Sequence, residues 1–101
     1  MTESERVAIA ARLHVALRRK TGRVTDTEWL AINVDYAAEI VRFARAHAAE
    51  AQDEELAAIA ARFEFAMEPL ALAARAQAAR AGADAGRPAG GPASRYVGGI
   101  R

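Results

Sequence analysis

The chain of 101 residues contains no cysteine. Disulfide bonds, thiol catalysis and cysteine-based zinc sites are therefore excluded. Long apolar runs are missing as well, because charged residues interrupt every segment before it reaches the ~18 residues of a membrane-spanning helix. The first five residues include two glutamates and are not followed by the apolar run of a secretory signal. From these absences we expect a soluble, cytoplasmic protein that does not bind membranes.

Aromatic residues make up only 6% of the chain, and before residue 82 there is one glycine, Gly22, and one proline, Pro69. In contrast, 28 residues are alanine, the strongest helix former, so the fold is predicted to be all-α. Alanine buries little area, and the few large apolar side chains must therefore provide most of the stability. We expect modest stability, in a monomer or a weak homo-oligomer.

Capping signals and apolar periodicity predict an antiparallel bundle of three main helices, near residues 3–21, 26–48 and 53–68. The first helix follows Thr2, which has a glutamate three residues later, the spacing of a capping box. It is predicted to end at Gly22, because glycine readily adopts the left-handed conformation of a helix C-cap.

The second helix is predicted to begin at a capping box formed by Thr25 and Glu28. Its apolar arc covers more than half the circumference, which is typical of a central helix with neighbours on two sides. We interpret four large residues of this arc as bundle core rather than as a ligand pocket: Trp29, Tyr36, Ile40 and Phe43. Asn33 lies in the same arc, and a structural role, fixing register or capping the loop after Gly22, is favoured over ligand binding.

Asp53, followed by two glutamates, predicts the N-cap of the third helix. Pro69 is expected to kink or end this helix, because proline lacks a backbone donor and its ring clashes with the preceding turn. A kinked or fraying extension is predicted to end at Gly82. Residues 1–81 are therefore predicted to form a helical bundle domain. Residues 82–101 contain most of the glycines and two of the three prolines, which predicts a disordered tail.

Charge is unevenly distributed, although the net charge is only +1. Residues 1–25 contain six basic and two acidic residues, residues 26–68 contain three basic and ten acidic residues, and residues 69–101 contain five basic residues and one acidic residue. A basic surface of this kind can bind nucleic acid. The candidate residues, used together with the tail arginines, are Arg12, Arg18, Arg19, Lys20 and Arg23. We favour the alternative that the basic helix packs beside an acidic one within the bundle.

No group of residues predicts a catalytic, cofactor-binding or metal-binding site. His14 and His47 lie on different predicted helices, and neither has the sequence spacing of a metal site. Glu64 and Glu68 lie one helical turn apart, but such pairs on an exposed helix face are normally solvated. We therefore predict a protein that is not an enzyme and has no cofactor.

Two segments are candidates for binding an unknown protein partner. Phe65 and Leu72 lie roughly opposite the core-facing side of the third helix, where they either contact the terminal helical segment or form an exposed patch. The second candidate is the terminal peptide on its flexible tether, whose apolar and basic residues are typical of a short linear motif: Arg95, Tyr96, Val97, Ile100 and Arg101. An unselected frayed end is the alternative interpretation of this peptide. The leading hypothesis is a protein–protein interaction module, and the alternative is an accessory nucleic-acid-binding protein.

The pattern TGRVTDxEWL at residues 21–30, the pattern NxDYA at residues 33–37 and the ending RYVGxxR at residues 95–101 occur together in this chain. In these features it resembles a group of small, uncharacterised α-helical proteins of β-proteobacteria. The resemblance implies a bacterial, cytoplasmic context and a tail whose end matters more than its glycine-rich tether. It implies no activity and no functional residues.

Overall fold

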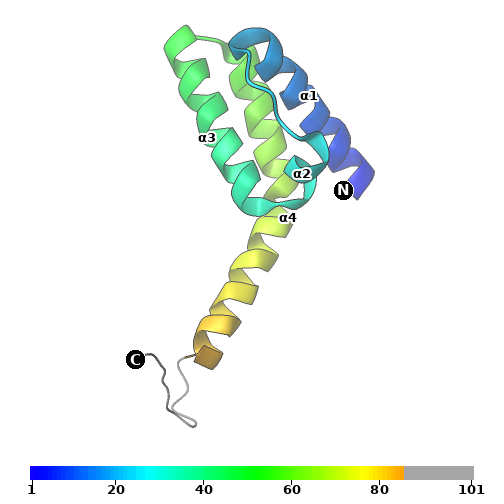
Figure 1. Cartoon of the computed structure of the whole chain (residues 1–101), viewed down its shortest axis with the longest axis vertical. Helices are drawn as coiled ribbons and strands as arrows, with labels where there is room; N and C mark the ends of the chain where they lie inside the picture. The colour runs from blue at the N-terminus through cyan, green and yellow to red at the C-terminus, as the bar shows by residue number, and fades with distance from the viewer. Residues whose placement is uncertain (86–101) are drawn as a thin grey trace.

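Four α-helices make up most of residues 1–85, the part of the chain that the computed structural model describes (Figure 1). They are α1 (Glu3–Thr21), α2 (Thr27–Ile32), α3 (Val34–Ala51) and α4 (Glu54–Ala85). No strand occurs in this part of the chain, so the predicted all-α bundle is confirmed. The predicted disordered tail lies outside the described residues from residue 86 onward.

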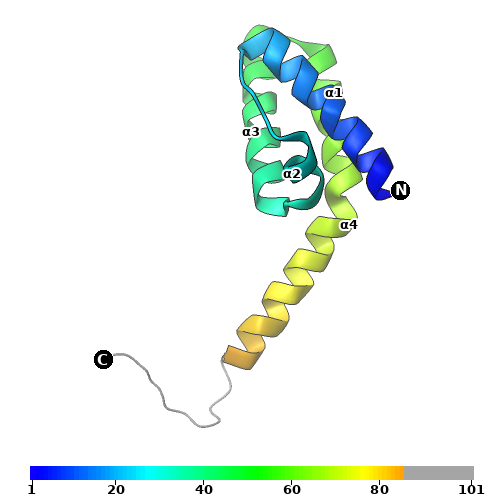
Figure 2. The same ribbon diagram turned by 45° about the vertical axis from the view of Figure 1, so that its right-hand side comes forward.

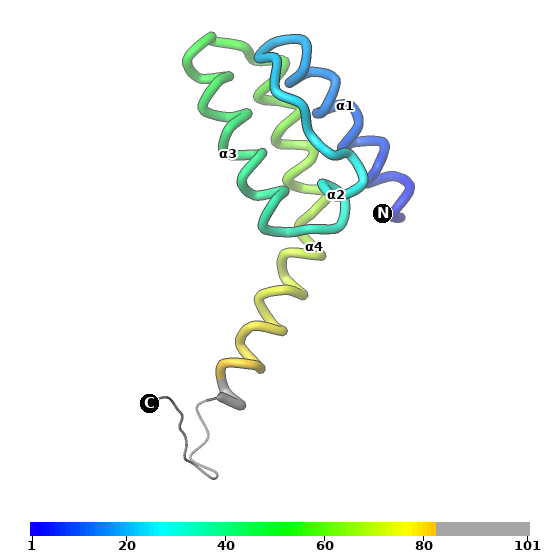
Figure 3. The backbone as a smooth tube through the Cα atoms, in the orientation of Figure 1, coloured from blue at the N-terminus to red at the C-terminus, as the bar shows by residue number. Residues whose placement is uncertain are grey.

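The bundle is formed by α1, α3 and the first half of α4, which packs against both of the others (Figure 1). α1 and α3 run in the same direction and α4 runs antiparallel to both, as the tube in Figure 3 shows. Alternating directions and a central second helix were predicted, whereas the central helix is α4. The difference arises in the non-helical residues 22–26, which return along the bundle before α2 begins (Figure 3).

The first helix has the predicted ends. The Thr2 Oγ1 accepts a hydrogen bond from the Glu5 backbone N–H at 3.1 Å, and the Glu5 carboxylate accepts one from the Thr2 backbone N–H at 2.6 Å. At the other end Gly22 has φ 79°, in the left-handed region, and its N–H donates to the Arg18 carbonyl at 3.1 Å. Both capping predictions for this helix are confirmed.

Asn33 divides the predicted helix 26–48 in two. Its backbone is extended, at φ −102° and ψ 112°, so it ends α2 and begins α3. The Asn33 side-chain oxygen accepts a hydrogen bond from the Tyr36 N–H at 2.8 Å, which satisfies a free donor in the first turn of α3. Asn33 therefore has the expected structural role, but it caps α3 rather than the loop after Gly22.

Asp26, and not Thr25, is the N-cap of α2. The Asp26 Oδ1 accepts a hydrogen bond from the Trp29 backbone N–H at 2.9 Å, whereas Thr25 is buried and bonded to another helix. The break at Asn33 interrupts the helical periodicity, so the buried side of α2 is not in line with that of α3. Trp29 therefore does not continue the core stripe of α3. Its side chain is 48% exposed and stacks on the Tyr36 ring at 4.5 Å, which corrects the prediction that it lies in the core.

The core lies between α1, α3 and the first half of α4, with α2 covering one end. Its largest fully buried side chains come from all four helices: Leu13, Leu17, Leu30, Ile40, Leu56 and Phe63. Tyr36 and Phe43 are partly buried against this core. Burial of a side chain of this size contributes roughly 1.5–3 kcal/mol, so these positions account for much of the stability.

The turn between α3 and α4 is short. Gln52 has φ 54°, in the left-handed region, and its N–H bonds to the last turn of α3. The Asp53 Oδ1 then accepts a hydrogen bond from the Leu56 N–H at 3.0 Å, so the predicted N-cap is confirmed.

α4 continues through Pro69 and through Gly82 as far as Ala85, a length of 32 residues. The ribbon of α4 changes direction where the helix leaves the bundle, and it does not end there (Figure 2). Proline removes the hydrogen bond to the carbonyl of Phe65. Phe65 and Pro69 are both exposed, so water can bond that carbonyl instead. The predicted end at Gly82 is wrong, because one glycine costs only about 1 kcal/mol relative to alanine in a helix rich in alanine.

The second half of α4 leaves the bundle and projects into solvent (Figure 2). Every residue from Leu72 to Gly82 is exposed. Among the described residues, no helix has the length and apolar character needed to cross a membrane.

Candidate functional site

Two large apolar side chains are exposed on the same side of α4. Phe65 is 70% exposed and Leu72 is 56% exposed. Their spacing of seven residues is close to two helical turns, so they differ by only about 20° around the helix. The same stripe carries Glu68, Arg75 and Ala79, and we refer to these five residues as the exposed face of α4.

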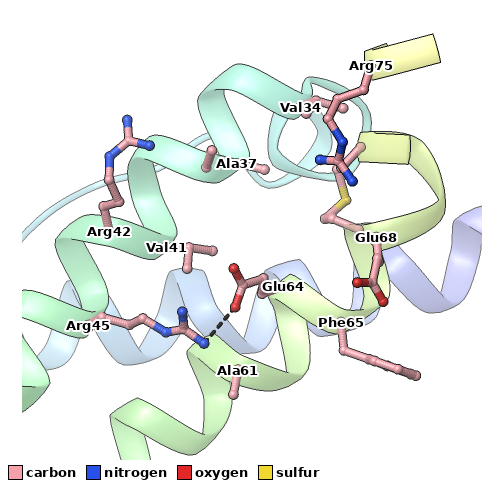
Figure 4. A pocket seen from close by; sticks show the side chains of 13 residues that line it. Val34, Ala37, Val41, Arg42, Arg45, Ala61, Glu64, Phe65, Glu68 and Arg75 are labelled. Atoms are coloured by element: carbon pink, nitrogen blue, oxygen red, sulfur yellow. Dashed lines mark ion pairs between the residues drawn. The ribbon is translucent and has the colours of Figure 1, made fainter. Parts of the chain in front are cut away.

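Phe65 also borders a groove between α3 and α4 with a volume of about 470 Å³ (Figure 4). Its buried floor is apolar and consists of Ala37, Val41 and Met67. Its rim is charged and includes residues of both signs: Arg42, Arg45, Glu64, Glu68 and Arg75. An apolar floor between two helices with a charged rim is the kind of surface that receives an amphipathic helix.

One ion pair crosses this groove. The Arg45 Nη2 of α3 lies 2.6 Å from the Glu64 Oε1 of α4, as Figure 4 shows. Both side chains are about half exposed, so the pair contributes at most about 1 kcal/mol. Arg75 extends from the projecting half of α4 back over the groove, and Phe65 points away from it (Figure 4). The groove and the exposed face of α4 are thus neighbouring parts of one surface.

The predicted basic patch is partly neutralised within the bundle. The Lys20 Nζ lies 2.8 Å from the Asp53 Oδ2 and 3.1 Å from the Glu55 Oε1. The Arg23 guanidinium pairs with Glu39 at 3.7 Å and lies 4.8 Å from the centre of the Phe43 ring. The other three predicted residues, Arg12, Arg18 and Arg19, are exposed. The basic end of α1 therefore lies beside an acidic helix start, as the favoured alternative expected.

The ion pair between Lys20 and Asp53 changes the pKa of both groups. The hydrogen bond from Lys20 lowers the pKa of the Asp53 carboxyl, and the Leu56 backbone N–H lowers it further. The hydrogen bonds to Asp53 and then to Glu55 raise the pKa of the Lys20 ammonium. These charges hold the end of α1 to the start of α4.

The histidines do not form a site. His14 is partly buried, and its Nδ1 lies 2.8 Å from the Thr25 Oγ1, a contact that the sequence analysis missed because the two residues are separated by an extended segment. His47 is partly buried on α3. Within the described residues, no three acidic or histidine side chains lie close enough together to hold a metal ion.

The terminal-peptide candidates, Arg95, Tyr96, Val97, Ile100 and Arg101, lie outside the described residues. The structure therefore places only Phe65 and Leu72 among the predicted partner-binding residues. The groove beside them was not predicted, because it depends on how α3 packs on α4 and not on any local pattern.

Comparisons of the chain with protein-family models, with curated proteins and with solved structures each gave no match.

Proposed function

We propose that this protein is a non-enzymatic protein–protein interaction module that binds its partner through the exposed face of α4 and the adjoining α3–α4 groove. The observation that supports this proposal is the exposure of Phe65 and Leu72 on one side of a helix that projects from its bundle. Burial of these two side chains against a partner would contribute roughly 1.5–3 kcal/mol each to the free energy of binding. Large aromatic and aliphatic anchors surrounded by charged residues are typical of interface centres.

The projecting half of α4 is itself unusual. A helical segment outside a bundle gains nothing from tertiary packing, and short isolated helices are marginal in water. This one has alanine at most positions, which keeps it helical without a core. We infer that it serves as a preformed docking element, so that binding does not have to supply the cost of ordering it.

Site-specific photo-crosslinking in cells tests the proposal. A photo-reactive residue in place of Ala79 lies on the exposed face of α4, and one in place of Ala81 lies on the opposite side of the same projecting segment. We expect covalent adducts with the partner from position 79 and few from position 81. The absence of adducts at both positions, or equal adducts at both, would contradict the proposal.

A second candidate function is accessory nucleic-acid binding by the basic residues of α1. It is supported by Arg12 and Arg19, which are exposed and lie seven residues apart on one side of the helix. Such binding should weaken steeply with salt, because each phosphate contact releases a counterion. If the protein is not retained on DNA or RNA at low salt, this candidate is eliminated.

A further inference from the structure

We propose that the partner of the exposed face of α4 is a second copy of this chain, bound antiparallel about a twofold axis. This inference rests on the function proposed above and names the partner for the same surface. Three features of α4 support a second copy as the partner. They are the order of charges along the exposed face of α4, the positions of large and small side chains on this face, and the adjoining α3–α4 groove.

The charges on the exposed face of α4 change sign along the helix. Glu68 lies at the end of the bundle half, and Arg75 lies two turns further along, in the projecting half; both are exposed. If two copies paired in parallel, Glu68 would meet Glu68 and Arg75 would meet Arg75. In an antiparallel pair each Glu68 meets Arg75 of the other copy, and symmetry produces this ion pair twice. The face is therefore electrostatically complementary to itself in the antiparallel direction only.

Alignment of Glu68 with Arg75 of the other copy also fixes the register. The twofold axis then crosses α4 between residues 71 and 72, midway between the two charges. The two Leu72 side chains meet at this axis. Phe65 lies level with Ala78 and Ala79 of the other copy, so the largest apolar side chain of the exposed face of α4 meets two of the smallest side chains. Apolar contacts thus occupy the centre and both ends of the interface between the two helices. One ion pair lies between the centre and each end.

The same register brings the projecting half of each copy onto the bundle half of the other. α4 has 32 residues, so the halves before and after residue 70 are nearly equal, each about 24 Å long. A projecting half from the second copy would lie beside the α3–α4 groove, whose floor of alanine, valine and methionine allows close approach. Each bundle of α1, α3 and α4 would then gain a fourth helix, a common and stable helical arrangement.

Charge-reversal variants test this arrangement by sedimentation equilibrium of the purified full-length protein. The wild type is expected to be a concentration-dependent dimer. Glu68→Arg places two arginines opposite each other, and Arg75→Glu places two glutamates opposite each other, so each variant alone should weaken the dimer by about tenfold or more. An equimolar mixture of the two variants should form a heterodimer, because the arginine introduced in one variant then faces the glutamate introduced in the other.

Leu72→Asp should weaken the dimer more strongly, by about a hundredfold, because it places two carboxylates at the axis. Circular dichroism checks that each variant remains folded, which is expected because all three positions are exposed in the monomer. Arg80→Glu is a matched control, since Arg80 lies on the projecting half but off the exposed face of α4. The dimerisation constant of Arg80→Glu should remain within about twofold of the wild-type value.

Three results would overturn the inference: a wild-type protein that remains monomeric up to about millimolar concentration, single variants that dimerise like the wild type, or a mixture that fails to associate. The two proposals fail separately. Crosslinks from position 79 to a different protein, with a monomeric purified chain, would refute the second copy and keep the interaction module. No crosslinks at all would refute the module itself.

Discussion

Thr25 connects the returning segment to α1. Its side chain is buried, its hydroxyl lies 2.8 Å from the His14 Nδ1, and its backbone N–H lies 3.4 Å from the same nitrogen. A buried polar group that loses its partner also lacks water, so the cost of breaking such a contact exceeds the value of the bond. The contact is therefore expected to hold the non-helical residues 22–26 along the bundle.

Thr25→Val keeps the shape of the side chain and removes the hydroxyl. We expect it to lower the free energy of unfolding by about 1–2 kcal/mol, because the His14 nitrogen loses its hydroxyl partner. Urea unfolding monitored by circular dichroism measures the change. Thr27→Val, at a partly buried threonine with no side-chain hydrogen bond among the described residues, is the control and should have a smaller effect. Equal losses in the two variants would contradict the assigned role of Thr25.

Asp53 should make stability depend on acid pH. Its pKa in the folded protein is lowered from the ordinary 3.8, first by the hydrogen bond from Lys20. A group whose pKa is lowered by folding stabilises the fold at pH values above its unfolded pKa. This contribution is lost as the pH falls through the lower, folded pKa. Lys20 behaves in the opposite sense: its contribution is present below 10.5 and is lost as the pH rises through its raised pKa.

Asp53→Asn tests this pH dependence, because asparagine still caps α4 but carries no charge. We expect the variant to lose less stability than the wild type between about pH 5 and about pH 2. Urea midpoints at a series of pH values measure the slope. Glu50→Gln, at an exposed carboxylate near the end of α3, should leave the slope as in the wild type. A slope unchanged in Asp53→Asn would show that the ion pair does not contribute.

At the scale of the helices, Asn33 is the residue that makes α2 and α3 two elements. Asn33→Asp keeps an acceptor for the Tyr36 N–H and is expected to retain stability. Asn33→Ala removes the acceptor and should cost about 1 kcal/mol. Thermal unfolding compares the two variants. If Asn33→Ala is as stable as Asn33→Asp, then packing alone, and not the cap, determines the break.

The sequence predicts most helix ends where the signal is local, although the cap of α2 is Asp26 and not Thr25. The capping box of α1, the glycine at its end and the Asp53 cap of α4 each depend on residues within one turn, and all three are present. The break at Asn33 could not be predicted in this way, because every neighbouring residue is compatible with a continuous helix. Tertiary packing also contributes to the break, since α2 buries Leu30 and Ala31 and contacts α1.

The candidate site was predictable only in part. Phe65 and Leu72 could be identified because they lie opposite the core stripe of the same helix, and this relation survives in the structure. The extension beyond Pro69 was predicted, but its projection into solvent was not, because the local pattern does not show whether such an extension packs on the bundle. The groove could not be predicted without the α3–α4 packing. The parallel direction of α1 and α3 could not be predicted either, because it follows from the path of residues 22–26, where Thr25 contacts His14 of α1.

For the whole molecule, stability is expected to vary along α4. The bundle half contains Leu56 and Phe63, which are fully buried, and unfolds only with the core. The projecting half has no such contacts and can open from its free end. Hydrogen exchange at low protein concentration should therefore show strong protection of amides in residues 60–67 and weak protection in residues 74–82. Uniform protection along α4 would contradict this description of the helix.

The position of the one tryptophan has a practical consequence for spectroscopy. Trp29 lies outside the core and is stacked on Tyr36, whose hydroxyl accepts a hydrogen bond from the Asp26 backbone N–H at 3.1 Å. Its fluorescence therefore responds to the corner where α2 meets α3, whereas far-ultraviolet circular dichroism responds to all the helices. A fluorescence transition that precedes the dichroism transition would measure how independently this corner opens from the rest of the bundle.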